Sequence, residues 1–417
     1  MNDALFSCIL IRMPTVEITA ERMTPEGDCT GRADGRTVFI PYAVPGERIE
    51  AEITHEEHGR CKARIARILE PSPFRTEPFC PYYGTCGGCT MQHITPEFQR
   101  KLRVQTLEES FWREGIQIPE IQVVSGPDKG YRARFQFHDG GLMGRRSNEI
   151  ISIERCPCAT DEINAYLAEI PAEERPRGRV HVFASSMISS VPPGYAKIVI
   201  AEPEETAKTF RRKKGQKSVR PRYEGTAPES ASACSVLIAG RTVSFDIRGF
   251  FQSNLIVLEK AVPLIAGHSS GKNLLDLYAG AGTFSVFLSD QFERTVLVEH
   301  NKGAVVYAEQ NMAGKPHESY GLSAGVWASY HAARCVQSNG AFDAAVIDPP
   351  RSGMEPSVRT WLSHSGIPLI KSISCSPAAH ARDVKFLTQA GYKVRRLLLL
   401  DFYPQTGHVE SFAELEK

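Results

Sequence analysis

The sequence predicts a multidomain protein with a small N-terminal β-barrel, a central α+β domain and a C-terminal α/β domain whose sheet is mainly parallel. Short strand-like runs near the N-terminus predict the barrel, and mixed strand and loop patterns predict the central domain. After about residue 248, short apolar strands alternate with helical stretches, which is typical of α/β domains. The 417 residues are enough for domains at 14–71, 72–247 and 248–417.

The N-terminal strands are expected at 16–20, 37–40, 48–53 and 62–68, with glycines and prolines between them as turn signals. The first 14 residues have an acid near the start and no small-residue cleavage site, so we expect no signal peptide. No apolar stretch reaches the roughly 18 residues needed to span a bilayer. The sequence therefore predicts a cytoplasmic protein that does not bind a membrane.

The composition is that of an ordinary globular protein, with 42% hydrophobic and 23% charged residues. A formal net charge of +1 argues against a uniformly basic nucleic-acid binder. One run, Arg211 to Arg222, is strongly basic and contains no acid. This run is either a phosphate-binding segment or a solvated loop.

The eleven cysteines include a cluster, Cys80, Cys86 and Cys89, in the sequence CPYYGTCGGC. An odd number of cysteines without an export signal favours metal binding or thiol chemistry over disulfides. A fourth ligand is needed, and Cys156 and Cys158 are the candidates. Thiolates bind zinc or iron–sulfur clusters, and this spacing favours iron–sulfur over zinc.

An amphipathic helix is expected at 97–113, and a glycine-rich turn follows the apolar strand at 273–277. That turn contains Gly280 and Gly282, which let the backbone approach a ligand at the carboxyl end of a parallel strand. The dinucleotide fingerprint requires a third glycine where Ser285 stands, so a nicotinamide cofactor is disfavoured. A plain strand-to-helix connection is the alternative.

Two acids end the neighbouring strands. Glu299 ends the next strand, where a carboxylate can accept hydrogen bonds from ribose hydroxyls. The strand at 344–347 ends in Asp348, and two prolines fix the turn that follows it. Similar turns in amino-group methyltransferases continue with an aromatic residue, but here Arg351 follows.

The strand at 369–374 delivers Cys375 to the same edge, and a helix begins directly after it. The helix dipole favours a thiolate there, although a buried structural cysteine is the alternative. A thiolate that attacks C6 of a uracil converts C5 into an enolate carbon able to accept a methyl group. A base must then remove the C5 proton. Glu410 is the candidate base, and His408 is the alternative.

Five motifs, in order CPYYGTCGGC, DLYAGAG, DPPRSG, SCSP and TGHVES, resemble those of the bacterial RNA uridine C5-methyltransferases. The resemblance implies an OB-like TRAM barrel, a central domain with a 4Fe-4S cluster, and a Rossmann-like methyltransferase domain that uses S-adenosylmethionine. It also implies that the helix at 97–113 packs on the catalytic domain. The segment 321–327 departs from the family pattern, because it offers no acid or amide for the adenine.

The resemblance also assigns residues. It implies Cys375 as the nucleophile and Glu410 as the base. The implied cluster ligands are Cys80, Cys86, Cys89 and Cys156, and the expected cofactor contacts are Gln252, Tyr278, Gly280, Thr283, Glu299 and Asp348. The leading hypothesis is a monomeric enzyme that methylates a uridine of 23S ribosomal RNA, with uridine 54 of transfer RNA as the alternative. A non-catalytic iron–sulfur RNA-binding protein is the third hypothesis.

Overall fold

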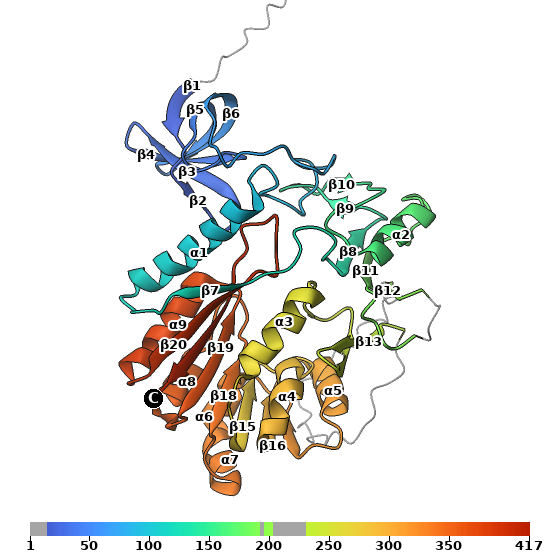
Figure 1. Cartoon of the computed structure of the whole chain (residues 1–417), viewed down its shortest axis with the longest axis vertical. Helices are drawn as coiled ribbons and strands as arrows, with labels where there is room; N and C mark the ends of the chain where they lie inside the picture. The colour runs from blue at the N-terminus through green and yellow to red at the C-terminus, as the bar shows by residue number, and fades with distance from the viewer. Residues whose placement is uncertain (1–14, 192–195, 203–230) are drawn as a thin grey trace, which may run out of the picture. The chain divides into compact units, whose positions relative to one another are not determined.

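The computed structural model describes residues 15–191, 196–202 and 231–417 (Figure 1). The basic run from Arg211 to Arg222 lies outside the described residues. The chain divides into two compact units. The first unit comprises the residues up to Tyr83 together with Cys89–Leu102 and Gln405–His408, and the second comprises Gly84–Gly88, Arg103–Pro404 and Val409–Lys417.

The first unit contains a single sheet with the strand order β1-β5-β6-β4-β3-β2. The strands are β1 (Thr15–Thr19), β2 (Arg22–Met23), β3 (Asp28–Ala33), β4 (Arg36–Pro41), β5 (Arg48–Glu57) and β6 (Arg60–Glu70). Neighbouring strands are antiparallel except β4 and β6. The two edge strands, β1 and β2, are separated in sequence by only Ala20 and Glu21, so the sheet closes on itself. The predicted N-terminal barrel is confirmed.

The barrel interior is filled by alternate residues of its strands, such as Val38, Ile40 and Ile49, which are fully buried. At Gly31 the chain of β1 passes close to β3. A Cβ atom at this position would overlap Ile18 Cγ2, so the close approach of the two strands requires glycine.

The second unit is built on an eight-stranded sheet with the order β17-β16-β15-β18-β19-β21-β20-β7. The strands are β7 (Ile121–Val124), β15 (Gly271–Leu277), β16 (Phe292–Val298), β17 (His317–Tyr320), β18 (Ala344–Ile347), β19 (Leu369–Ser374), β20 (Lys393–Leu400) and β21 (Glu410–Glu416). The strands from β17 to β19 are parallel, and β21 is antiparallel to both of its neighbours. The predicted mainly parallel sheet is therefore confirmed.

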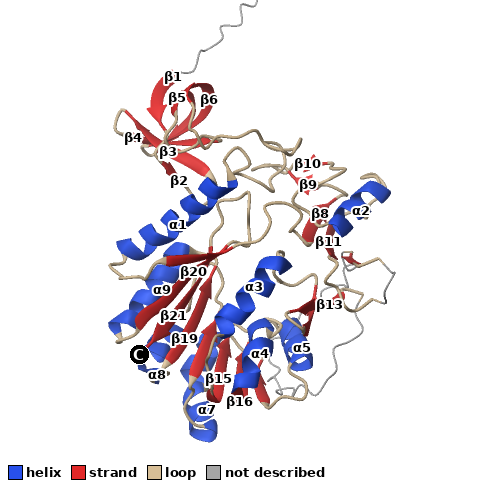
Figure 2. Ribbon diagram, in the orientation of Figure 1, coloured by secondary structure: helices blue, strands red, loops and turns tan. Residues whose placement is uncertain are grey.

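Helices cover both faces of this sheet (Figure 2). They are α3 (Leu255–Ala266), α4 (Thr283–Leu288), α5 (Lys302–Asn311), α6 (Ala324–Tyr330), α7 (Ala332–Asn339), α8 (Pro356–Ser365) and α9 (Pro377–Gln389), with a short 3-10 turn at Ser289–Gln291. One apolar cluster joins the sheet to α3, α4 and α5, and a second joins it to α6, α7, α8 and α9. Leu274 and Leu275, consecutive in β15, point into different clusters, as expected for a strand buried on both faces.

The sheet extends beyond the expected boundary at residue 248. β7 pairs in parallel with β20, so a segment far upstream in the sequence completes the sheet (Figure 1). The helix α1 (Pro96–Arg113) also comes before residue 248 and packs with this domain, because its Leu107 and Phe111 belong to the apolar cluster of α6 to α9. The packing of α1 agrees with what the family resemblance implies, whereas the pairing of β7 was not expected, because the period of the apolar residues does not say which sheet they face.

The remaining part of the second unit is α+β. An antiparallel sheet beside α2 (Asp161–Glu169) consists of β8 (Arg134–His138), β11 (Arg179–Ala184) and β12 (Ile198–Ala201). Two smaller sheets have two strands each. One pairs β9 (Leu142–Met143) with β10 (Ile150–Ile151), and the other pairs β13 (Ala233–Ile238) with β14 (Arg241–Asp246). Among the described residues, no helix is long and apolar enough to cross a membrane.

Candidate active site

The antiparallel pairing of β19 with β21 brings the predicted nucleophile and base together. Ser374 pairs with Ser411 in the ladder. The next residues along the two strands, Cys375 and Glu410, therefore lie opposite each other at the end of the pair. Cys375 is partly exposed, whereas Glu410 is 3% exposed. A partly accessible thiol thus lies next to a buried carboxyl group.

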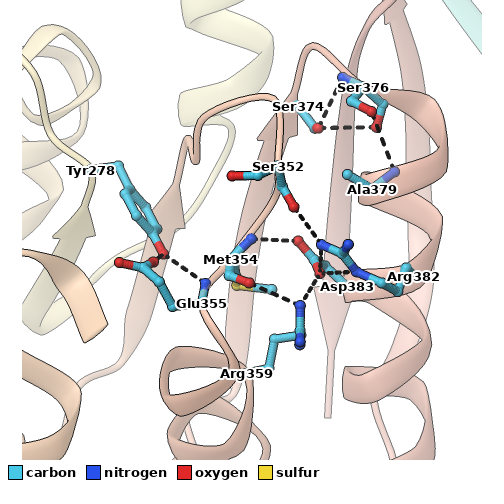
Figure 3. A network of polar contacts seen from close by, with 10 residues as sticks. All are labelled: Tyr278, Ser352, Met354, Glu355, Arg359, Ser374, Ser376, Ala379, Arg382 and Asp383. Atoms are coloured by element: carbon cyan, nitrogen blue, oxygen red, sulfur yellow. Dashed lines mark hydrogen bonds and ion pairs between the residues drawn. The ribbon is translucent and has the colours of Figure 1, made fainter. Parts of the chain in front are cut away.

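Hydrogen bonds of Ser374 and Ser376, the residues before and after Cys375, hold the turn that carries the thiol (Figure 3). The Ser376 amide donates to Ser374 Oγ at 3.2 Å, and this hydroxyl donates back to the Ser376 carbonyl at 3.3 Å. Ser376 is also the N-cap of α9, because its Oγ accepts from the Ala379 amide at 3.4 Å. Pro377 begins the helix, where its missing N–H costs nothing. The position of the thiol is therefore well defined.

The charges around Cys375 favour the thiol over the thiolate. Burial and the carboxylates of Glu410 and Asp348 raise the pKa of Cys375 to about 11, and the Arg351 guanidinium opposes this rise. Burial and the two acids therefore favour the thiol, against the stabilisation of the thiolate that is expected from the helix dipole. Arg351 is the nearby group that favours ionisation.

Acidic residues meet at the carboxyl ends of β15, β16 and β18. Burial and then the Asp348 charge raise the pKa of Glu410 well above its usual value. Burial and Glu299 raise the pKa of Asp348 to about 7. Burial, with added repulsion from Asp348 and Glu299, raises the pKa of Asp276 to about 7. Burial and mutual repulsion therefore make all three carboxyl groups bind protons more readily than ordinary acids.

Tyr403 is a site residue that sequence reasoning missed. It lies in the segment between β20 and β21, and burial and the charges of Glu410 and Cys375 raise the pKa of its hydroxyl. No motif marks this position. Asp276 is visible in the sequence only as part of the glycine-rich motif, and in the structure its Oδ2 accepts a hydrogen bond from Ser285 Oγ at 2.6 Å.

The expected cofactor residues of the glycine-rich turn lie around the ends of β15 and β16. Tyr278 has a φ of 63°, unusual for a residue with a Cβ atom, and its hydroxyl donates to the Glu355 carboxylate. Glu299 accepts hydrogen bonds from the Gly280 amide at 2.9 Å and the Asn301 amide at 2.6 Å. Apart from Gly280 itself and its two chain neighbours, no described residue has an atom within 4 Å of the place where a Cβ of Gly280 would stand. The turn therefore has room for a ligand against its backbone.

The loop after Asp348 is tied to α9, the helix that follows Cys375 (Figure 3). Asp383 on α9 accepts from the Met354 amide at 2.7 Å and from Arg359 at 3.0 Å. The neighbouring Arg382 donates to the Ser352 carbonyl at 2.7 Å. The same helix thus supports both the thiol and the loop that carries Arg351.

Replacement of Asp383 by alanine is expected to lower the free energy of unfolding by about 3 kcal/mol, because it leaves the mostly buried Arg359 guanidinium and the Met354 amide without this carboxylate. Urea unfolding of the full chain measures the change. Glu108→Ala, at an exposed position of α1, is the control and is expected to change the stability by less than about 0.5 kcal/mol. An Asp383→Ala protein as stable as the control would contradict this account of the loop.

The cysteines of the predicted cluster fall in both units. Cys80 and Cys89 belong to the first unit, and Cys86 and Cys156 belong to the second. All four are partly exposed, and none is in a disulfide. Within the described residues, no group of three or more His, Cys, Asp or Glu side chains is arranged to hold a metal ion. The structure therefore gives no support to the predicted iron–sulfur site.

Comparison with known proteins assigns the family. Residues 14–64 match the TRAM domain, and residues 334–417 match the tRNA (Uracil-5-)-methyltransferase family. An uncharacterized RNA methyltransferase of Treponema denticola is 34% identical over 92% of this chain and 94% of its own length. The chain belongs to the RNA uracil-C5-methyltransferases. The methyltransferase is also 29% identical to a 23S rRNA (uracil(1939)-C(5))-methyltransferase of Halomonas elongata, over 96% of this chain and 89% of that protein.

A solved structure shows the same fold as this methyltransferase. The tRNA (uracil-54, C5)-methyltransferase of Pyrococcus abyssi, in complex with S-adenosyl-L-homocysteine, matches with a TM-score of 0.69 and 21% identity, and the match covers 96% of this chain and all of that one. The fold agrees with the family assigned above, whose members are S-adenosylmethionine-dependent enzymes, as this methyltransferase is. The hypothesis of a non-catalytic RNA-binding protein is therefore wrong.

The residues present in the methyltransferase fit this cofactor. Gln252 lies between β14 and α3 and is 6% exposed, yet its Oε1 has no hydrogen-bond partner among the described residues. A buried carbonyl oxygen without a donor is unfavourable unless a ligand supplies one. Glu299 adds a carboxylate suited to ribose hydroxyls, and the open space at Gly280 leaves room for the ligand.

Proposed function

We propose that this methyltransferase modifies C5 of a uridine in 23S ribosomal RNA through a covalent bond between Cys375 and C6 of the base. The observation that carries the proposal is the Ser374–Ser411 pair of the β19–β21 ladder, beyond which Cys375 faces Glu410. Addition of a nucleophile to C6 and removal of a proton from C5 are the two steps that a uracil requires from the protein. These two side chains can perform one step each.

The proposed chemistry follows from these two groups. The sulfur of Cys375 bonds to C6, and the electrons of the C5–C6 double bond move toward C5 as an enolate. When bound, S-adenosylmethionine would supply an electrophilic methyl group to C5 and would leave as S-adenosylhomocysteine once the bond between methyl and sulfur breaks. Glu410 takes the C5 proton, the electrons of that bond restore the double bond, and the Cys375 thiolate leaves. We assign cofactor binding to Gln252, Tyr278 and the neighbouring residues of the glycine-rich turn, with Glu299 and Asp348.

The acids around Glu410 suit it to the role of a base. Burial and the Asp348 charge raise its pKa, so its carboxylate has a high affinity for the C5 proton. Arg351 opposes the rise for both Glu410 and Cys375 and therefore favours the ionised forms that act in the reaction. Asp348 also contributes negative charge near the place where a sulfonium cation is expected.

Several relatives named as 23S rRNA (uracil(1939)-C(5))-methyltransferases support ribosomal RNA as the substrate. Transfer RNA is the second candidate, because the Pyrococcus abyssi enzyme with the same fold is named for uracil 54 of transfer RNA. Since the fold is common to enzymes of both kinds, the fold does not separate them.

Mapping 5-methyluridine in total RNA from a strain without the gene tests this choice. The expected result is loss of one 5-methyluridine in 23S ribosomal RNA with normal modification of transfer RNA, and restoration by the wild-type gene but not by one encoding Cys375→Ala. Loss at uridine 54 of transfer RNA, with ribosomal RNA intact, would overturn the proposed substrate.

A cationic face on the sheet of β8 and β11 supports RNA binding. Gln136 pairs with His181 and His138 pairs with Arg179 in this sheet, so these side chains lie on one face. Burial and the charges of Arg134 and Arg179 lower the pKa of His181. His181 is therefore neutral, and the positive charge of this face comes from Arg134 and Arg179, whose mutual repulsion a polyanion would relieve. To reach Cys375, the target base must leave its stack, so we propose that the flanking RNA lies on this face while the uridine is flipped.

Replacement of Arg179 by alanine is expected to weaken RNA binding by about tenfold at low salt and to reduce the slope of log affinity against log salt by about one. Arg179 is exposed, so the change should not affect folding. Arg395→Ala, at an exposed ion pair on β20, is the matched control. Equal salt slopes for Arg179→Ala and the wild-type protein would exclude this face from the RNA contact.

We also propose that Cys80, Cys86, Cys89 and Cys156 bind a 4Fe-4S cluster. The proposal rests on the spacing of the first three cysteines in the sequence and on their thiols being reduced and partly exposed. Protein purified without oxygen is expected to contain about four iron and four sulfide per chain. Cys89→Ser should lose them, and Cys234→Ser, at a buried position of β13, should keep them. One zinc and no iron would reject the proposal.

A further inference from the structure

His380 lies inside α9, five residues after Cys375, and it is 1% exposed. Its Nδ1 lies 2.7 Å from Ser411 Oγ. The Ser411 hydroxyl in turn donates to the Ser374 carbonyl at 3.3 Å. With the single hydroxyl proton of Ser411 on the Ser374 carbonyl, Nδ1 carries the proton of the ring and donates it to Ser411. His380 is thus a neutral ring that holds the Ser411 hydroxyl in a fixed orientation.

Neutrality of the ring agrees with its surroundings. Burial lowers the pKa of His380 to about 3, so the ring stays uncharged across the pH range in which the enzyme works. Nε2 then has a free lone pair, and no hydrogen-bond partner for it exists among the described residues. The Phe111 ring packs edge-on against the imidazole, with the ring centres 5.6 Å apart. A buried acceptor without a donor is unfavourable, so packing alone would favour an apolar side chain here.

The two residues that His380 connects flank both reacting groups. Ser374 directly precedes Cys375, Ser411 directly follows Glu410, and the two serines are paired in the ladder. They form the last pair of the β19–β21 ladder before the site, and on its other side β21 pairs with β20 as far as Glu410. The hydrogen bond from His380 ties this last pair to α9, the helix whose N-terminal turn also holds Ser376.

We propose that His380 is a positioning residue of this methyltransferase, which fixes Glu410 relative to Cys375 through the Ser411 hydroxyl. This inference rests on the proposed roles of Cys375 and Glu410. His380 does not exchange protons with the substrate, and it acts only through the geometry of the strand pair. The step most sensitive to its loss is removal of the C5 proton, because Glu410 must reach the substrate while C6 is still bonded to sulfur.

The test is to replace His380 by leucine, which has a similar size and no donor. The expected result is a kcat about tenfold lower, an unchanged KM for RNA and for S-adenosylmethionine, and a larger fraction of enzyme held in the covalent RNA adduct at steady state. His380→Asn retains an N–H donor at a similar distance and should recover most of kcat. Ser411→Ala should lower kcat by about the same factor as His380→Leu. The double variant should have a kcat no lower than that of either single variant.

His317→Leu is the matched control, because His317 is also a largely buried, hydrogen-bonded histidine but lies at the beginning of β17. Its kcat should stay within about twofold of wild type. A wild-type kcat in His380→Leu, or an equal loss in His380→Asn and His380→Leu, would overturn the inference. If His380→Leu does not fold, Ser411→Ala decides: a kcat about tenfold below wild type supports the inference, and a wild-type kcat overturns it. Absence of any Cys375 adduct in the wild-type enzyme would instead refute the proposed function.

Discussion

Replacement of Cys375 by alanine is expected to lower the rate of 5-methyluridine formation by at least about a thousandfold. Without addition at C6, carbon 5 of uracil has no electron pair to offer a methyl group, and no other described residue at the end of β19 carries a thiol. Single-turnover transfer of a labelled methyl group to an RNA fragment measures the loss. The variant should still bind RNA and cofactor, because the thiol contributes little to either.

Cys335→Ala is the control for this experiment, since Cys335 is buried on α7 in the same unit and the chemical change is the same. It should retain its rate within about threefold. RNA that contains 5-fluorouridine gives a second readout, because fluorine at C5 cannot be removed as a proton and the adduct should persist. Adduct formation by Cys375→Ala would show that another residue attacks the base.

Much of the site could be predicted because it lies at the carboxyl ends of parallel strands. A short apolar run that ends in Glu299, Asp348 or Cys375 is visible in the sequence, and consecutive parallel strands deliver their ends to one edge. The barrel was predictable for a similar local reason, since its strands and turns alternate within a few residues. Both predictions depend on local patterns that repeat along the chain.

The remaining features depend on pairings between distant segments. Glu410 faces Cys375 only because β21 runs antiparallel to β19 in one particular register, and no local pattern specifies that register. β7 joins the same sheet from more than a hundred residues upstream. The raised pKa of Cys375 is a collective effect of burial and two acids from different strands, and a helix-dipole argument based on sequence neighbours does not include these groups.

The two reacting groups oppose each other electrostatically in the resting enzyme. A charged Glu410 raises the pKa of Cys375, so the base that completes the reaction disfavours the thiolate that begins it. Binding of a cationic cofactor would reduce this conflict, as Arg351 does in part. Removing the charge of Glu410 should therefore favour formation of the Cys375 thiolate and slow the removal of the C5 proton.

Replacement of Glu410 by glutamine is expected to lower the overall rate by a factor of roughly 100 to 10,000, because an amide cannot accept the C5 proton. Attack by Cys375 and methyl transfer do not need this base. Enzyme should therefore accumulate as a methylated covalent adduct with unmodified uridine RNA, a species that the wild-type enzyme releases. Denaturing gel electrophoresis with labelled RNA measures the adduct, and mass spectrometry of the digested adduct detects the added methyl group.

The same variant should have a more reactive thiol. When the Glu410 carboxyl is ionised in the wild-type protein, its charge raises the pKa of Cys375, so loss of that charge lowers the pKa of Cys375 and raises the fraction of thiolate. Alkylation of Cys375 by iodoacetamide, followed peptide by peptide, should be faster in Glu410→Gln than in wild type. Arg351→Gln should change the rate in the other direction, since it removes the cation that lowers the pKa. A Glu410→Gln protein that forms no adduct and alkylates no faster would mean that Glu410 neither faces the thiol nor takes the proton.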